Sequence, residues 1–140
     1  MNIEIKLDKR AKMPTRAHQF DAGFDLYAPN AIIILPHKSV TIDTGVHMRI
    51  PDNYVGFLKS KSGLNVKHGI TSEGVIDAGY TGSIVVKLYN NSDLPYGFNT
   101  GDKITQIVIL PVQTPFCELV EVEDFEETER GENGFGSSGK

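Results

Sequence analysis

The chain is a succession of short strand-like segments, and this pattern constrains its fold more than any other feature. Apolar and polar or β-branched residues recur over residues 3–7, 24–27, 31–35, 40–42, 46–50, 54–59, 83–90, 103–110 and 118–122. Turn-forming residues separate them at 29–30, 36–37, 44–45, 51–53, 90–93 and 100–102. Many short strands with regular turns predict an all-β sandwich or a closed barrel of jelly-roll type. The best helix candidate is a single turn at 62–67.

Size and charge exclude several classes of protein. The 140 residues suit one domain, and 39% hydrophobic with 23% charged residues indicates a folded chain. The formal net charge of −4 argues against a nucleic-acid partner. The longest apolar runs, 31–35 and 107–110, are too short to cross a membrane. Residues 1–7 alternate in polarity, which indicates a strand and not a signal peptide.

The C-terminal end differs in composition from the rest. Residues 121–129 are strongly acidic, and residues 130–140 are rich in Gly and Ser, so we expect a β domain over 1–125 and a flexible arm over 126–140. Arg130 and Phe135 are unusual in such an arm, because a plain linker needs neither. The single cysteine, Cys117, lies in an apolar run, so we expect a buried thiol in a reducing compartment.

The segment 74–82, Gly-Val-Ile-Asp-Ala-Gly-Tyr-Thr-Gly, has unusual chemical content. A short apolar strand runs into Asp77, a turn with glycine follows, and Tyr80 precedes the next strand. We expect a β-hairpin with a carboxylate and a phenol at its bend. Ordinary hairpin turns carry small polar residues, so this bend suits a pocket for a flat ligand that needs a base.

Other clusters allow two interpretations each. Lys61 and Ser62 stand at the start of the possible helical turn, which suits either an anion site or a solvated strand end. Asp25 suits a hydrated Mg²⁺, or else it is one of two solvent-facing acids with Asp21. Gln106 is either a phosphate donor or an exposed residue. The four histidines have no metal-ligand spacing, and no nucleotide-binding glycine loop or hydrolase serine motif is present.

Taken in order, five clusters resemble the five motifs of the homotrimeric dUTPases, the dUTP nucleotidohydrolases. The clusters are 21–27, 60–64, 74–82, 101–106 and 130–139, so the resemblance spans almost the whole chain. It implies a jelly-roll β-barrel with a C-terminal flexible arm, and a cytoplasmic homotrimer whose interfaces hold three active sites. It also implies Mg²⁺-dependent hydrolysis of dUTP to dUMP and pyrophosphate, by water attack on the α-phosphate. Such an enzyme limits uracil incorporation into DNA and supplies dUMP for thymidylate synthesis.

The resemblance also implies roles for single residues. Asp77 corresponds to the carboxylate that activates the attacking water, and Tyr80 to the ring that packs on the deoxyribose and excludes a 2′-hydroxyl. Asp25 would hold Mg²⁺ through water. Main-chain groups around the hairpin would read uracil; the residues concerned are Gly74, Val75, Ile76 and Val85.

The remaining implied contacts concern the triphosphate and the arm. Lys61, Ser62 and Gly63 would bind phosphates, with help from Gln106. Position 61 departs from the family, which usually has Arg there, so the charge is kept and the fork geometry is lost. The arm would close as a lid, with the γ-phosphate held by Arg130 and Ser137 and the uracil covered by Phe135 beside Gly136.

Three alternatives compete with this interpretation. A dCTP deaminase would have the same barrel, but we expect it to be longer, to carry Glu in place of Asp77 and to lack Phe135. A dUTPase-like interaction protein that has lost catalysis would not be expected to keep Asp77, Tyr80, Arg130 and Phe135. A general all-β binding module does not explain why the five clusters occur together.

Overall fold

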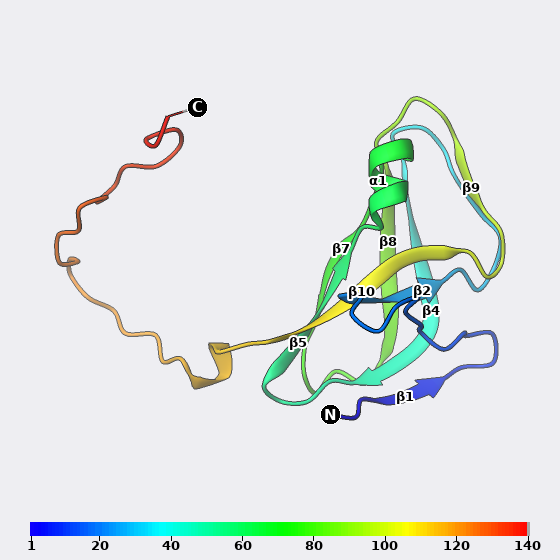
Figure 1. Ribbon diagram of the computed structural model, residues 1–140, viewed down its shortest axis with the longest axis horizontal. Helices are drawn as coiled ribbons and strands as arrows, with labels where there is room; N and C mark the ends of the chain where they lie inside the picture. Colours follow the sequence, from blue (N-terminus) through cyan, green and yellow to red (C-terminus); the bar gives the residue numbers. More distant parts are fainter. Residues whose placement is uncertain (140) are drawn as a thin grey trace.

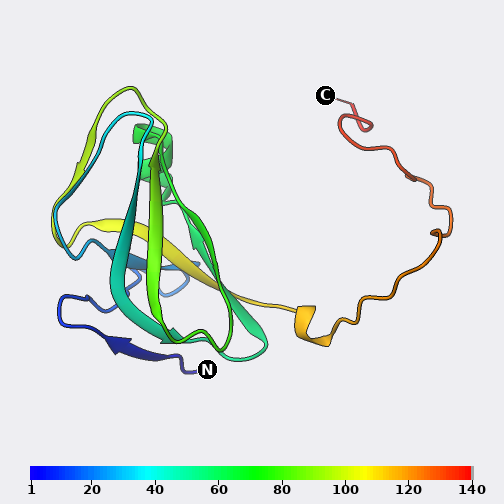
Figure 2. The ribbon, with the colours of Figure 1, turned by 180° about the vertical axis from the view of Figure 1, so that it is seen from behind.

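The computed structural model describes residues 1–139 and consists of strands with one short helix (Figures 1 and 2). Sheet 1 has the strand order β1-β4-β8-β6, sheet 2 has the order β2-β10-β5-β7, and β3 pairs with β9. The strands are β1 Glu4–Leu7, β2 Gly23–Tyr27, β3 Ile32–Ile34, β4 Ser39–Arg49, β5 Tyr54–Lys59, β6 Ile70–Thr71, β7 Glu73–Ile76, β8 Ser83–Asn90, β9 Tyr96–Phe98 and β10 Lys103–Pro111.

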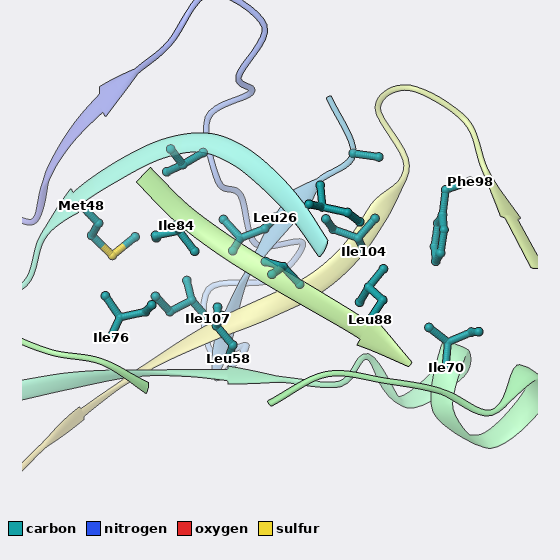
Figure 3. Packing of buried hydrophobic residues seen from close by; sticks show 14 of the residues in the cluster. Leu26, Met48, Leu58, Ile70, Ile76, Ile84, Leu88, Phe98, Ile104 and Ile107 are labelled. Atoms are coloured by element: carbon teal, nitrogen blue, oxygen red, sulfur yellow. The ribbon is translucent and has the colours of Figure 1, made fainter. Parts of the chain in front are cut away.

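The core lies between the two sheets, and alternation within the strands builds it. In β8, Ile84, Val86 and Leu88 are fully buried, whereas the residues between them face outward. Sheet 2 contributes Leu58 and Ile107 to the same cluster (Figure 3). The expected all-β fold is confirmed. Among the described strands, no ladder joins sheet 1 to sheet 2, so the jelly roll is two packed sheets and not a closed barrel.

Strand β4 corrects one predicted turn. Residues 40–42 and 46–50 were expected as two strands separated by a turn at 44–45, but a single strand runs through them. Its register with β8 shifts between Asp43 and His47, and Gly45 has a φ of 68°. Thr44 and Gly45 therefore form a β-bulge, in which a residue with positive φ bends the strand without ending it.

Further local predictions are incomplete or wrong. Strands β6 and β9 were missed, and residues 118–122, which were expected as a strand, form none. A strand needs a bonded neighbour, and no strand of the described chain lies beside this segment. Cys117 is exposed and not buried, because it follows the 3-10 turn Thr114–Phe116, beyond the last strand.

The predicted helical turn is present and slightly longer than expected. Helix α1 spans Ser62–His68, and Gly69 ends it in the left-handed conformation with φ 66°. Lys67 and His68 stand in its last turn, where positive charge complements the helix dipole. Two residues separate the helix from β5, so Ser62 and Gly63 lie just beyond the C-terminal end of this inner strand of sheet 2.

The predicted hairpin at 74–82 is not a bonded hairpin. Strand β7 pairs with β5, and β8 pairs with β4, so the two strands that flank the segment belong to different sheets. The local sequence indicated the turn correctly but could not reveal that both strands have other partners. Residues 77–82 therefore form a loop between two diverging strands, which we call the crossover loop.

Beyond the 3-10 turn, the described residues 117–139 contain no strand or helix and extend away from the sheets in both views (Figures 1 and 2). Lys140, the last residue of the expected arm, lies outside the described residues. In the described part of the chain, no helix is long and apolar enough to span a membrane.

Candidate functional site

A buried carboxylate with two ammonium partners stands on the outer face of sheet 2. Asp25 on β2 is only 5% exposed. Lys61, at the start of α1, donates to its Oδ1, and Lys103 on β10 lies 2.9 Å from its Oδ2. Burial by itself would raise the pKa of Asp25, but hydrogen bonds and charge from the two lysines outweigh it and hold that pKa below its ordinary value.

Strand pairing brings Gln106 and the start of α1 to this cluster. Gln106 is directly opposite Asp25 on one side and Lys59 on the other. Its amide donates to the carbonyl of Ser60 at 3.1 Å. Ser60 is itself fixed, since its hydroxyl accepts from the main chain of Ser72 at 2.9 Å. Residues from three predicted motifs therefore meet, namely 21–27, 60–64 and 101–106.

The Asp25 cluster is where the implied Mg²⁺ would bind. Within residues 1–139, no three His, Cys, Asp or Glu side chains are grouped to hold a metal. A carboxylate has about four lone-pair positions, and the two lysines use two of them, so water can still bond to Asp25. Mg²⁺ is typically held by one or two carboxylates, several waters and substrate phosphates, and Asp25 fits that pattern. With both lysines the cluster has a net positive charge, which favours a metal that arrives with a polyphosphate.

The crossover loop carries Asp77 and Tyr80 on a tight turn. The main chain of Tyr80 donates to the carbonyl of Asp77 at 3.2 Å, and Gly79 has a φ of 86°, which favours glycine. The Tyr80 hydroxyl donates to the carbonyl of Ser83 at 2.8 Å. This bond folds the ring back over Gly82, where an added Cβ would lie 2.5 Å from the Tyr80 hydroxyl oxygen.

The strands beside the loop present unbonded main-chain edges to each other. Strand β7 is an edge strand, and β8 is bonded to β6 only through Tyr89 and Asn90. The main chain of β7 and of the first half of β8 therefore has hydrogen-bonding groups that no ladder uses. Ile76 is 8% exposed, and its side chain belongs to the core. Gly74 is needed for packing, since a Cβ there would lie 2.9 Å from Leu58 Cδ1.

A cleft of about 500 Å³ borders the loop on the outer face of sheet 2. Asp77 and Ala78 line one side, and Val112, Thr114 and Pro115, which follow β10, line another. Between them Phe57 and Val75, which are opposite each other in the β5–β7 register, form an apolar floor. Val75 is 60% exposed, which is high for an apolar strand residue.

The arm holds the remaining predicted residues apart from the sheets. Arg130 donates from Nε to the carbonyl of Asn133 at 2.9 Å, which curls the arm on itself. Phe135 is fully exposed. Gly136 has a φ of 90°, and Ser137 donates from its main chain to Gly134 at 3.0 Å. These contacts are all local to the arm.

The predicted site residues thus occupy three separate places in one chain. Asp25 and Glu73 stand in one row across sheet 2, three strand spacings of about 4.8 Å apart, and Asp77 is four residues of about 3.4 Å beyond Glu73. Asp25 and Asp77 are therefore about 20 Å apart by strand geometry. Two carboxylates at that separation cannot act on the same phosphate group.

Comparison with known proteins agrees with the order of these motifs. The model of the dUTPase family matches residues 9–139. The deoxyuridine 5'-triphosphate nucleotidohydrolase of Gloeobacter violaceus is 42% identical over 132 residues, which cover 91% of this chain and 88% of that protein.

The chain belongs to the dUTPase family.

Solved structures of other dUTPases have the same fold. The Staphylococcus bacteriophage 80alpha dUTPase with dUPNHPP superposes with a TM-score of 0.91 at 36% identity, covering 99% of both chains. A variant of the dUTPase from phage phi11 of S. aureus, in which a structural Mg(II) ion is coordinated, gives a TM-score of 0.81 at 34% identity, covering 91% of this chain and all of that one. The dCTP deaminase alternative loses its support, because the family model that matches is the dUTPase one.

Sequence reasoning missed Lys103 in the Asp25 cluster. The residue stands within the motif 101–106, but nothing in the sequence shows that its side chain reaches Asp25. That contact follows from the pairing of β10 with β2, in which Lys103 is opposite Tyr27, and from the register shift just beyond it.

Proposed function

We propose that this chain hydrolyses dUTP to dUMP and pyrophosphate, with water attacking the α-phosphorus. The observation that carries the proposal is the pair of unbonded strand edges, β7 and β8, beside a loop that holds a carboxylate and a tyrosine ring. A planar base needs fixed donors and acceptors, and an open pair of main-chain edges supplies them. The role in limiting uracil incorporation into DNA and supplying dUMP follows from the same reaction.

The base and sugar bind at these edges. Main-chain groups of Gly74, Val75 and Ile76 on β7, with Val85 on β8, pair with uracil. A cytosine amino group would present a donor to a donor, and a 5-methyl group would clash with the main chain, so both are disfavoured. The Tyr80 ring, held by Ser83, packs on the deoxyribose and leaves no space for a 2′-hydroxyl.

Water activation is assigned to Asp77. A carboxylate that accepts a hydrogen bond from water can orient it in line with the α-phosphorus and take its proton. Positioning and electrostatic stabilisation supply most of the rate enhancement in phosphoryl chemistry. The main-chain bond from Tyr80 to Asp77 fixes the loop from which this carboxylate projects.

The triphosphate is assigned to the Asp25 cluster and to α1. Lys61 and Lys103 supply positive charge, and Ser62, Gly63 and Gln106 supply donors. Asp25 would hold Mg²⁺ through water, and the metal would neutralise phosphate charge. Arg130 and Ser137 would bind the γ-phosphate when the arm closes, and Phe135 with Gly136 would cover the base.

A homotrimer would bring these separate parts together. Asp25 and Asp77 of one chain are about 20 Å apart by strand spacing, so a complete site needs Asp77 from another copy. The arm, which extends away from its own sheets, would reach a further copy. The exposed apolar floor of the cleft at Phe57 and Val75 supports a contact between copies, because apolar surface of this kind is usually covered.

Pyrophosphate release with dUTP, dCTP, dTTP and UTP tests the proposed function. We expect turnover with dUTP to exceed turnover with the other three by at least about a hundredfold. Asp77→Asn should abolish turnover and still bind dUTP. Asp93→Asn is the matched control, because Asp93 is an exposed carboxylate paired with His37 away from the loop. Near-normal pyrophosphate release by Asp77→Asn would remove this residue from its role.

A further inference from the structure

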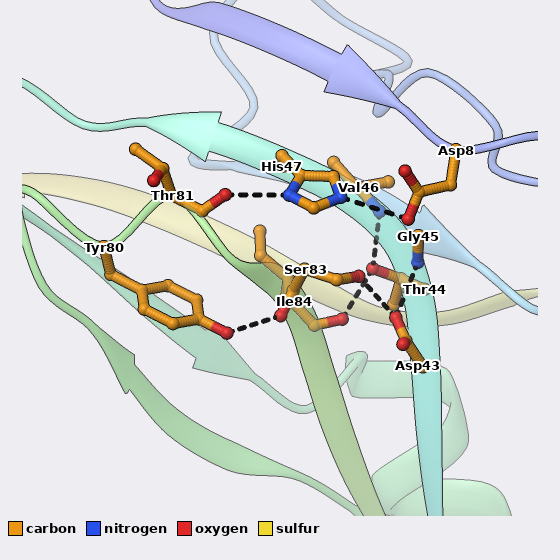
Figure 4. A network of polar contacts seen from close by, with 10 residues as sticks. All are labelled: Asp8, Asp43, Thr44, Gly45, Val46, His47, Tyr80, Thr81, Ser83 and Ile84. Atoms are coloured by element: carbon orange, nitrogen blue, oxygen red, sulfur yellow. Dashed lines mark hydrogen bonds and ion pairs between the residues drawn. The ribbon is translucent and has the colours of Figure 1, made fainter.

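The bulge in β4 is bonded to the crossover loop and to the start of β8, and this connection has no part in the proposed chemistry (Figure 4). The Thr44 hydroxyl donates to the carbonyl of Ile84 at 2.7 Å. The Ser83 hydroxyl donates to Asp43 Oδ1, which also accepts from the main chain of Gly45 at 3.0 Å. Because the bulge re-aims successive side chains of β4, they reach consecutive residues of β8.

His47, at the end of the bulge, bonds the loop itself. Its Nδ1 lies 2.8 Å from the carbonyl oxygen of Thr81, and its Nε2 lies 3.0 Å from Oδ2 of Asp8. A carbonyl and a carboxylate can only accept, so both ring nitrogens must carry hydrogen for both bonds to exist. The main chain of Asp8 in turn donates to the carbonyl of Gly45 at 2.9 Å, which anchors Asp8 to the bulge.

The ionisable groups around His47 come from each neighbouring element. On the β1 side, Asp8 favours the protonated ring, and Lys6, directly opposite His47 in register, opposes it. On β4 the Asp43 carboxylate lies nearby, and in the loop the Tyr80 hydroxyl is bonded to the carbonyl of Ser83. The bonds to Thr81 and Asp8 raise the pKa of His47 above its ordinary value.

We propose that His47 and Asp8 are positioning residues that hold the crossover loop, and with it Asp77 and Tyr80, in its working place. Thr81 is adjacent to Tyr80 and four residues after Asp77, so a fixed Thr81 carbonyl limits where both side chains project. The proposal rests on the proposed function, because it takes the loop to be the catalytic one. It assigns no contact between His47 and substrate.

Protonation of His47 controls the strength of this connection. The doubly protonated ring makes both bonds, and a neutral ring can make only one of them. Since the folded pKa is raised, the stability that the protonated ring contributes is fully present below the unfolded value of about 6.5 and is lost as pH rises through the folded pKa. The loop is therefore held more firmly at the acidic end of the neutral range.

Two substitutions separate the two bonds. In His47→Asn the side-chain amide places an N–H near the position of Nδ1, so the bond to Thr81 is kept without a titrating group. In His47→Gln the amide reaches the position of Nε2, so only the bond to Asp8 is kept. We expect kcat/KM for dUTP to stay within about threefold of the unaltered chain in His47→Asn and to fall about tenfold or more in His47→Gln.

The pH profile and the kinetic split distinguish positioning from simple destabilisation. Loss of folded enzyme lowers kcat and leaves KM and the pH profile unchanged. A displaced loop raises KM as well. We also expect the unaltered chain to show a step in kcat/KM where His47 titrates, and His47→Asn should remove this step. Equal kcat/KM for His47→Asn and His47→Gln across the pH range would overturn the proposal, as would a step that persists in His47→Asn.

A titration of the imidazole resonances does not depend on enzyme activity, so it tests the role of His47 separately from the proposed dUTP hydrolysis. Imidazole resonances of the chain give the pKa of His47, which should exceed the ordinary histidine value of about 6.5 and should fall in Asp8→Asn. A His47 pKa that is unchanged in Asp8→Asn would overturn the connection. If the unaltered chain releases no pyrophosphate from dUTP, the proposed function fails. The resonance measurement still decides whether His47 is bonded to Asp8 beside the loop.

Discussion

Gly82 is the position at which a single added carbon should alter sugar selectivity. The Tyr80 ring lies across Gly82, and a Cβ at that position would be 2.5 Å from the hydroxyl oxygen and 2.6 Å from Cζ. Ordinary contacts of this kind are about 3.4 Å or longer, so in Gly82→Ala the ring must move by about 1 Å. The ring is at the free end of a flexible side chain, and the chain should remain folded.

The displaced ring has two consequences. The hydrogen bond from Tyr80 to Ser83 is lost. Its net contribution of about 0.5–1.5 kcal/mol then no longer holds the ring in this orientation. A misplacement of about 1 Å at a packing surface costs up to about a hundredfold in rate, so kcat/KM for dUTP should fall about 10- to 100-fold. UTP should lose less, because the space for its 2′-hydroxyl increases, and the preference for dUTP over UTP should narrow by about tenfold or more.

Steady-state pyrophosphate release with dUTP and UTP measures both changes. Gly97→Ala is the matched control, since Gly97 lies on β9 and its nearest non-neighbouring atom would be 3.9 Å from the added Cβ. That variant should match the unaltered chain in both rate and selectivity. If Gly82→Ala retains the full preference for dUTP, the Tyr80 ring is not the sugar filter.

Three other predictions address stability and the arm. Asp25→Asn should reduce the loss of unfolding free energy at acid pH. The folded pKa of Asp25 is depressed, so the stability that its carboxylate contributes is present above its unfolded pKa of about 3.9. This stability is lost as pH falls through the lower folded value. Urea midpoints between pH 3 and pH 7 check this, and parallel curves for both proteins would contradict it. Deletion of residues 130–140 should cut kcat severely and shift the melting temperature by less than about 3 °C, because the described arm residues are exposed. An unchanged kcat would refute the lid. Ile84→Ala should cost about 2–5 kcal/mol in urea unfolding, since Ile84 is fully buried in the core, and a loss below about 1 kcal/mol would place Ile84 outside it.

Local sequence predicted the strands whose burial alternates, and it failed where pairing decides the structure. Residues 83–90 were predicted with the right bounds, because apolar Ile84, Val86 and Leu88 alternate along one face of β8. Residues 118–122 have similar alternation but no partner among the described strands, so they form no strand. The turn at 44–45 was wrong for a related reason: glycine marks a bulge as readily as a turn, and only the β8 ladder distinguishes them.

The candidate site shows the same division. The order of the motifs indicated the family, and the family model agrees. The roles of individual residues remain predictions, but the structure shows how they are distributed. No local sequence pattern predicts that β7 pairs with β5. Because of that pairing, β7 is not bonded to β8. Lys103 was missed because its contact with Asp25 depends on a register shift between distant strands.

The open edges of β7 and β8 also bear on how this protein can change by mutation. Under the proposed function, the base is recognised by peptide groups, and every residue other than proline carries the same donor and acceptor. Substituting Val75 or Val85 alters packing but leaves the recognition groups in place. Substitutions at Val75 and Val85 should therefore leave the preference for uracil unchanged. A new base preference would require an insertion or deletion that shifts the main chain, an event much rarer than a point mutation.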